Sequence, residues 1–338
     1  MPKLRRRSAL GAFLYDLRYR IGEYSLRGFI RCLPYIPFRA VELFTVLMAR
    51  ATFYLIWRYR RRMEENIAAT MSREIPDPDE RKALARQAWL NFARTVLDTT
   101  AIMHCSKQQI IERVALEGEK NLQAALKQGK GVLALSAHLG SFTMIGARLA
   151  AAGYPFSVVV KQPAHKRFAQ LTDDYRSQIG IHTISAKPRS EAVRGILKAL
   201  RQNRIVLVIA DEFKSGDVLV DFFGLMLPAP RGPATLALRT GAVTLPMFAV
   251  RQADDSLTLS VGAPIEPIAR EDLEASVLAT TALFTSHLEQ AIRRYPSQWN
   301  WLGLPKHRVN AIQPESTRDE FAAQSASDDA IQKTGTLS

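Results

Sequence analysis

Residues 132–143 read VLALSAHLGSFT, an apolar run that ends at a histidine and passes into a helical pattern. The first six residues are apolar or small, which is typical of a strand that is buried on both faces of a sheet. His138 follows directly, and after Gly140 a new helix is expected. A histidine at the end of a buried strand and beside a helix N-terminus is well placed to act as a general base.

Strand-like and helix-like patterns alternate through much of the chain. The periodicity predicts strands at residues 131–137, 156–161, 181–185, 204–210 and 243–250. Residues 257–261 alternate apolar and polar side chains, like an edge strand. Helices are expected at residues 80–104, 118–128, 141–152, 167–179, 190–202, 234–240 and 271–295. This order predicts an α/β fold with a mostly parallel sheet covered by helices.

Two polar residues follow predicted strands directly. His138 follows the first of them, and Asp211 follows the buried strand at 204–210. Ligands of open parallel sheets bind at the carboxyl ends of the strands. His138 and Asp211 therefore face one crevice if the two strands are neighbours, which the sequence alone leaves open.

The net charge of +14 is concentrated in an N-terminal arm. Residues 1–62 contain 14 Lys and Arg residues against three acidic residues, a net charge of +11. The other 276 residues have a net charge of only +3. An anionic membrane surface met by this arm is the expected partner. Net charge alone would suggest a nucleic-acid-binding protein. No other feature of the sequence supports this function, so we expect no nucleic-acid partner.

An apolar run at residues 41–57 marks the arm as a membrane anchor. It has 17 residues, includes Glu42 and Arg50, and is preceded by Pro34 and Pro37, whereas about 20 apolar residues cross a bilayer. The run is either a single span or a helix lying in the interface, and an amphipathic core helix with a solvated basic edge is the alternative. The basic cluster at 58–62 predicts a domain on the cytoplasmic side, and no signal peptide is recognised.

The chain is expected to have three parts. They are a basic membrane-anchoring segment at 1–62, a catalytic domain at 63–308, and a tail at 309–338 that is rich in Ser, Asp, Gln and Thr and expected to be disordered.

Several classes of site are excluded by their missing motifs. Two distant cysteines favour a reducing compartment and neither a disulfide framework nor a zinc site. The six histidines show no metal spacing, and neither a G-x-S-x-G elbow nor a phosphate-binding glycine motif occurs. We expect no metal ion and no cofactor.

A Pro- and Gly-rich loop at 228–234 offers a second candidate site. Its backbone N–H groups and Arg231 could bind an anion at a helix N-terminus, beside Gly232. An ordinary turn before a helix explains the loop equally well. Asp211 and Glu212 are candidate catalytic carboxylates, or else residues of a cap or turn.

An ordered set of motifs resembles a known family. The set comprises Arg62 and Asn66, GEKNL at 118–122, GKGV at 129–132 leading to His138, VVVK at 158–161, Arg176, Asp211, FFG at 222–224, GPA at 232–234, LRTGA at 238–242 and PSQWNW at 296–301. Over residues 20–302 the chain resembles the late acyltransferases of lipid A biosynthesis (lauroyl/myristoyl type), within the lysophospholipid acyltransferase group.

The resemblance implies a membrane-bound α/β enzyme of the glycerolipid acyltransferase type at the cytoplasmic face of the inner membrane. Such an enzyme transfers a fatty acyl chain from an acyl carrier protein or coenzyme A thioester to a glycolipid hydroxyl. His138 would be the general base, and Lys161, Arg176, Arg231 and Gly232 would bind phosphates of the donor or acceptor. Acyl-chain length would follow from the depth of a hydrophobic pocket.

The chain departs from the family motif at one position. The motif has an Asp or Glu five residues after its His, where this chain has Thr143. Either Asp211 or Glu212 substitutes for that carboxylate, or the enzyme is slow or uses His138 without a partner. The rival hypothesis is a catalytically impaired family member that binds a lipid or a partner protein. The chain also has LGLPK at 302–306 where the family has a basic, aromatic stretch.

Overall fold

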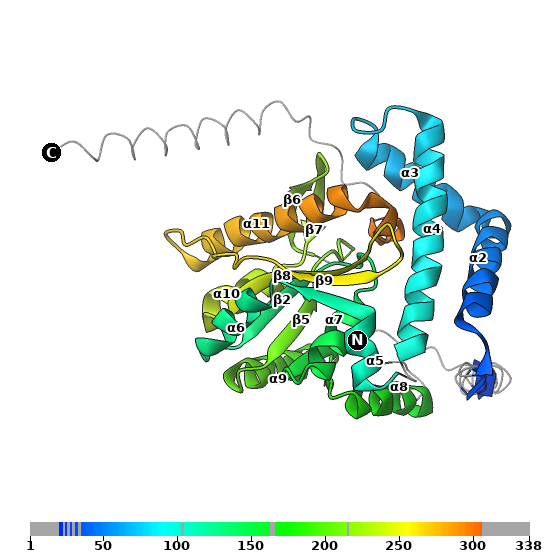
Figure 1. Cartoon of the computed structure of the whole chain (residues 1–338). Coiled ribbons are helices and arrows are strands. Elements are labelled where there is room, and N and C mark those ends of the chain that lie inside the picture. Colours follow the sequence, from blue (N-terminus) through cyan, green and yellow to red (C-terminus); the bar gives the residue numbers. More distant parts are fainter. Residues whose placement is uncertain are drawn as a thin grey trace, which may run out of the picture.

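A mixed seven-stranded sheet forms the centre of the molecule (Figure 1). The computed structural model describes residues 35–102, 105–162, 166–214 and 216–305, with a few residues between 20 and 32. The strand order is β1-β9-β8-β2-β5-β3-β4, and every neighbouring pair is parallel except β8 and β9. The strands are β1 (Val114–Glu117), β2 (Val132–Ser136), β3 (Phe156–Val160), β4 (His182–Ser185), β5 (Ile205–Ile209), β8 (Val243–Arg251) and β9 (Leu257–Val261). The predicted α/β fold is confirmed.

The strands at one side of the sheet correct the sequence prediction. β9 was expected at an edge, but β1 pairs with it in parallel and takes the edge position. β1 was missed because it has four residues and begins where helix α5 (Lys107–Arg113) ends. A separate antiparallel hairpin of β6 (Val218–Phe222) and β7 (Leu225–Ala229) was also not predicted.

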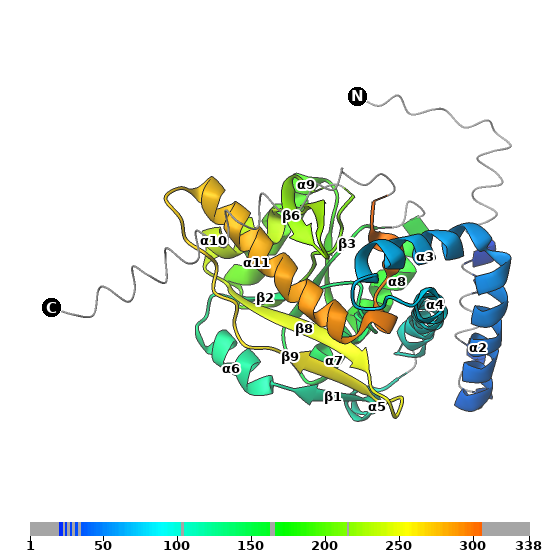
Figure 2. The ribbon, with the colours of Figure 1, turned by 90° about the horizontal axis from the view of Figure 1, so that it is seen from above.

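Helices cover both faces of the sheet (Figure 2). α5, α6 (Glu119–Lys127) and α7 (Thr143–Ala151) lie on one face, and α9 (Arg189–Arg201), α10 (Gly232–Thr240) and α11 (Leu273–Arg294) lie on the other. Successive side chains of β2 point to opposite faces. Leu133 and Leu135 therefore pack in the cluster with α9–α11, whereas Val132 and Ala134 pack in the cluster with α5–α7. Burying a leucine of this kind contributes roughly 1.5–3 kcal/mol.

Three helices stand at one end of the sheet, namely α2 (Phe38–Leu55), α3 (Trp57–Met71) and α4 (Pro78–Ala101) (Figure 1). α4 begins where the Asp77 carboxylate accepts a hydrogen bond from the backbone N–H of Asp79, with Pro78 in the first turn. Within the part of the chain described, no single helix is long and apolar enough to cross a membrane. Residues 39–55 of α2 and α3 meet that criterion only as a pair, bent by 87°.

The predicted three-part division remains a prediction. Its boundary between residues 62 and 63 falls inside α3. The expected tail at 309–338 lies outside the described residues.

Candidate active site

His138 and Asp211 meet at the carboxyl ends of two neighbouring strands. β2 and β5 are parallel partners with Ser136 opposite Ile209, and each functional residue follows its strand by two positions. The Nδ1 atom of His138 lies 2.8 Å from Oδ1 of Asp211. The strand order thus brings together the two residues that the sequence could only place at separate strand ends.

The Asp211 carboxylate is buried and accepts three hydrogen bonds. Its Oδ2 atom accepts from the backbone N–H of His138 and from the indole N–H of Trp299, both at 2.8 Å. An ionised carboxylate is only an acceptor, so the Nδ1 atom of His138 must donate to Oδ1. The neutral imidazole then has its lone pair on Nε2, which is the state a general base requires.

Trp299 reaches the site through a short backbone pairing. Leu139 and Trp299 form an antiparallel bridge, flanked by hydrogen bonds from the N–H of Gly140 to the carbonyl of Gln298 and from the N–H of Asn300 to that of His138. In the sequence Trp299 stands out only as part of the motif at 296–301, and its contact with Asp211 was not predicted.

Burial and charge act in opposite directions on the pKa of His138. Burial alone would lower this pKa. The hydrogen bond and the negative charge of Asp211, with a smaller contribution from the charge of Glu212, outweigh burial and raise the pKa of His138 above its ordinary value. A more basic imidazole accepts a proton more readily from a weakly acidic hydroxyl group.

The histidine borders a long apolar cavity of about 570 Å³. Its walls include residues 156 and 158–160 of β3, Leu207 and Ile209 of β5, and side chains of α7 and helix α8 (Lys166–Gln178). Phe142, which also lines the cavity, packs edge-on against the imidazole at 5.1 Å between ring centroids. The arrangement places a basic nitrogen beside a volume that suits a small ligand with a large apolar part.

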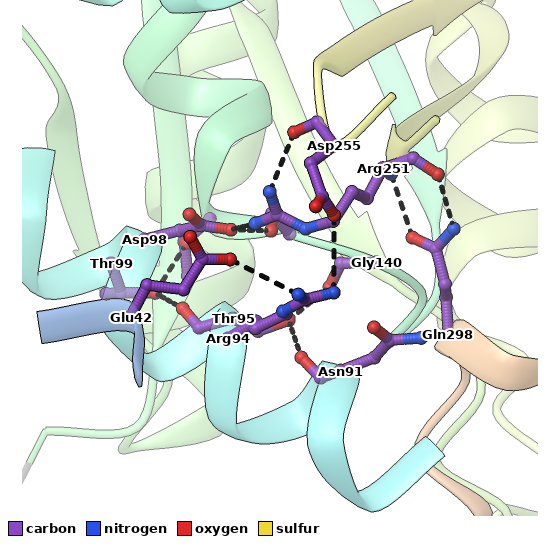
Figure 3. Close-up of polar contacts among 12 residues, drawn as sticks. Glu42, Asn91, Arg94, Thr95, Asp98, Thr99, Gly140, Arg251, Asp255 and Gln298 are labelled. Atoms are coloured by element: carbon purple, nitrogen blue, oxygen red, sulfur yellow. Dashed lines mark hydrogen bonds and ion pairs between the residues drawn. The ribbon is translucent and has the colours of Figure 1, made fainter. Parts of the chain in front are cut away.

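A buried polar network on α4 holds the loop that follows His138 (Figure 3). Asp98 accepts hydrogen bonds from the Ser141 hydroxyl and from Nη2 of Arg251, the latter at 2.6 Å. Thr95 donates to the carbonyl of Gly140 at 3.1 Å. Gly140 has a φ of 58°, and a Cβ atom there would lie 2.2 Å from the carbonyl oxygen of Ala249. Only glycine fits this approach of the loop to β8.

The network continues outward to neighbouring elements. Arg94 on α4 pairs with Glu42 on α2 at 3.2 Å and with Asp255 in the turn between β8 and β9 at 3.3 Å (Figure 3). Gln298 exchanges two hydrogen bonds with the backbone of Arg251. Residues from four separate segments therefore fix the position of the His138 loop, and none of these contacts was predicted from the sequence.

The sequence profile of the bacterial lipid A biosynthesis acyltransferase family matches residues 15–305. The chain belongs to this family. It is similar to a phosphatidylinositol mannoside acyltransferase of Mycobacterium tuberculosis, with 27% identity over 227 residues, which cover 67% of this chain and 70% of the relative. A phosphatidylinositol mannoside acyltransferase of Mycolicibacterium smegmatis is 25% identical over 297 residues, which cover 83% of this chain and 93% of the relative. The chain is thus a member of a family of lipid acyltransferases.

Thr143 lies five residues after His138, the spacing at which the resemblance led us to expect a carboxylate. It is the first residue of α7 and lines the same cavity as His138. Its hydroxyl lies 2.8 Å from that of Thr99 on α4, which donates in turn to the carbonyl of Thr95. Thr143 therefore ties α7 to α4, while the imidazole Nδ1 is bound by Asp211.

The predicted phosphate-binding residues fall into two groups. Lys161 and Arg176 line the cavity, and Arg176 is also paired with Asp173 at 2.5 Å. Arg231 and Gly232 begin α10 on the other face of the sheet, where Arg231 pairs with Glu274 at 2.5 Å. The structure thus brings Lys161 and Arg176 together with His138 and places Arg231 elsewhere. The described residues contain no group of three or more His, Cys, Asp or Glu side chains that could hold a metal ion.

Proposed function

We propose that this protein is a membrane-associated O-acyltransferase that moves a fatty acyl chain from a thioester donor to a hydroxyl group of a glycolipid. The observation that carries the proposal is the hydrogen-bonded pair of His138 and Asp211 at the wall of an apolar cavity. A general base and an acyl-sized cavity are the two requirements of this transfer.

His138 and Asp211 act together in the proposed mechanism. Nε2 of His138 takes the proton of the acceptor hydroxyl as its oxygen attacks the thioester carbonyl carbon, forming a tetrahedral intermediate. The intermediate collapses with cleavage of the carbon–sulfur bond, and the proton passes from His138 to the departing thiolate. Asp211 orients the imidazole and stabilises its positive charge.

The donor and acceptor follow from the chemistry around the cavity and from the relatives. Lys161 and Arg176 are suited to bind phosphates of an acyl carrier protein or coenzyme A donor. The acceptor is a glycolipid, either a lipid A precursor or a mannosylated phosphatidylinositol of the kind named for the relatives.

The protein is proposed to act at the cytoplasmic face of the inner membrane, with α2 lying in the interface. One side of α2 packs on α4 through Ala49 and Phe53, whereas Leu43, Phe44 and Leu47 are exposed. Exposed apolar side chains beside a basic cluster at 58–62 suit an anionic bilayer surface. Phe44→Asp should weaken co-sedimentation with anionic vesicles. Leu219→Asp, an exposed leucine on β6, is the matched control, and equal binding by the two variants would contradict this placement.

The rival hypothesis of an impaired lipid-binding protein had Thr143 as its main support. The hydrogen bond between the Asp211 carboxylate and Nδ1 of His138 supports the active enzyme, because it supplies a carboxylate partner for the imidazole.

Acyl transfer by purified, detergent-solubilised protein tests the proposal. Mass spectrometry would follow products from acyl carrier protein and coenzyme A thioesters with a panel of glycolipid acceptors. Activity should be lost in His138→Ala and retained in His182→Ala, an exposed histidine on β4. Transfer that survives in His138→Ala would refute the mechanism, and an inactive natural protein that still binds lipid would favour the rival.

A further inference from the structure

The apolar cavity has a definite direction. Its lining includes Phe156, Val158 and Val160 on β3, and these alternate residues face the same side of the sheet. Val160 lies near the carboxyl ends of the strands, where His138 and Lys161 are found, and Phe156 is the first residue of β3. At about 3.3 Å per residue, Phe156 lies roughly 13 Å deeper than Val160.

Three residues approach one another at the deep end. Gly146 lies one helical turn along α7 from Thr143, away from the entrance. A Cβ atom on Gly146 would lie 2.6 Å from Cε1 of Phe156 and 3.2 Å from Cδ1 of Ile181. Gly146, Phe156 and Ile181 all line the cavity, so this contact forms part of its wall at the deep end.

The glycine is not explained by the helix that contains it. Gly146 has no positive φ and lies inside α7, where alanine would form helix more readily. The missing side chain leaves room for the Phe156 ring, which is buried. An added methyl group must displace that ring, and both groups border the same volume.

We infer that Gly146 sets the length of the acyl chain that the enzyme accepts, with Phe156 and Ile181 closing the end of the cavity. The inference rests on the proposed acyl transfer for the identity of the ligand. A side chain at residue 146 narrows the deep end and excludes the terminal carbons of longer chains. A methylene that no longer fits in an apolar pocket typically costs about 10- to 200-fold in specificity.

The test compares single variants that act in opposite directions. Wild type, Gly146→Ala and Phe156→Leu would be assayed with a homologous series of saturated acyl thioesters. Gly146→Ala should lower kcat/KM at least tenfold for the longest donor that the wild type accepts, relative to shorter donors. Phe156→Leu should shift the preference to longer chains, and the double variant should return towards the wild-type profile because the smaller side chain makes room for the methyl group.

A control and a second measurement separate this inference from the proposed function. Ile145→Val changes a buried residue of α7 outside the cavity lining and should leave the chain-length profile unchanged. Binding of the same series as non-reactive thioether analogues to His138→Ala protein reports the cavity depth without catalysis. If Gly146→Ala shifts the preferred chain length in this binding assay while the wild type shows no acyl transfer, the length-setting role is supported and the proposed reaction is refuted. An unchanged profile in both Gly146→Ala and Phe156→Leu, or no binding of any chain, would overturn the inference.

Discussion

Asp211→Asn is the sharpest test of the candidate site because it changes one atom of a residue with three hydrogen bonds. Oδ2 accepts two N–H groups, from the His138 backbone and Trp299, whereas Oδ1 accepts one from the imidazole. An asparagine has a single carbonyl oxygen, which is best placed towards the two donors. Its amide NH₂ then faces Nδ1 and donates to it, so the imidazole proton moves to Nε2.

This change of tautomer fixes the expected size of the effect. Loss of one hydrogen bond to a charged group would cost about 1.5–3 kcal/mol, or roughly 10- to 150-fold in rate. A histidine with its proton on Nε2 cannot accept the proton of the substrate hydroxyl. The same substitution in a serine-protease triad lowers kcat by about 10⁴, which corresponds to roughly 5 kcal/mol. We therefore expect a loss near 10⁴ in kcat.

The pH dependence of the residual activity gives an independent measure. In the proposed mechanism the free base is the active form of His138, so activity is expected to fall when the pH drops below the pKa of His138. In Asp211→Asn the negative charge that outweighs burial is absent, the pKa of His138 falls, and the acidic limb of the rate profile moves to lower pH. Asp254→Asn, in an exposed turn, is the control and should change neither quantity. A loss of less than tenfold, or an unmoved acidic limb, would refute the proposed role of Asp211.

Three further substitutions probe the surroundings of this pair. Trp299→Phe removes one donor from the Asp211 carboxylate, which should raise the pKa of His138 and move the acidic limb to higher pH; a shift the other way would contradict this. Thr143→Glu should not increase kcat, since Nδ1 is already bound; activity gained from an inactive wild type would show that the site lacks a working carboxylate. Asp98→Ala removes a buried carboxylate from the partly buried Arg251 and should lower the free energy of unfolding by about 1.5–3 kcal/mol in denaturant titrations, against an expected change below 1 kcal/mol for Asp254→Ala.

The fold was largely predictable because its strands are apolar runs that alternate with amphipathic helices. β2 and β5 were recognised within one or two residues for this reason. α5 and β1 have only seven and four residues and no turn between them, so periodicity predicted neither element. The edge position predicted for β9 was wrong. Alternating apolar and polar residues indicate that one face of a strand is more polar, but they do not show whether another strand pairs with it.

The site was predictable only in part, because its contacts join distant segments. The sequence placed His138 and Asp211 at strand ends, but the strand order decides whether they meet. Trp299 and Asp98 gave no comparable signal. The sequence does not show whether the indole N–H of Trp299 or the carboxylate of Asp98 faces solvent or a partner. Their partners, Asp211 and Arg251, are 88 and 153 residues away in the chain.

In the proposed site, the carboxylate that contacts His138 comes from the neighbouring strand and not from residue 143. A carboxylate can be brought to the neighbourhood of His138 from the first turn of α7, which follows it in the chain, or from the end of β5, which lies beside β2. The second route also lets one carboxylate accept the His138 backbone N–H, so that loop and imidazole are held by the same group. An ionised side chain at residue 143 is then not required. Thr143 instead links α7 to α4 through its hydrogen bond with Thr99, beside the apolar cavity. In the proposed mechanism, Asp211 therefore supplies the carboxylate at Nδ1 of His138, and catalysis by this chain does not require an acidic residue at position 143.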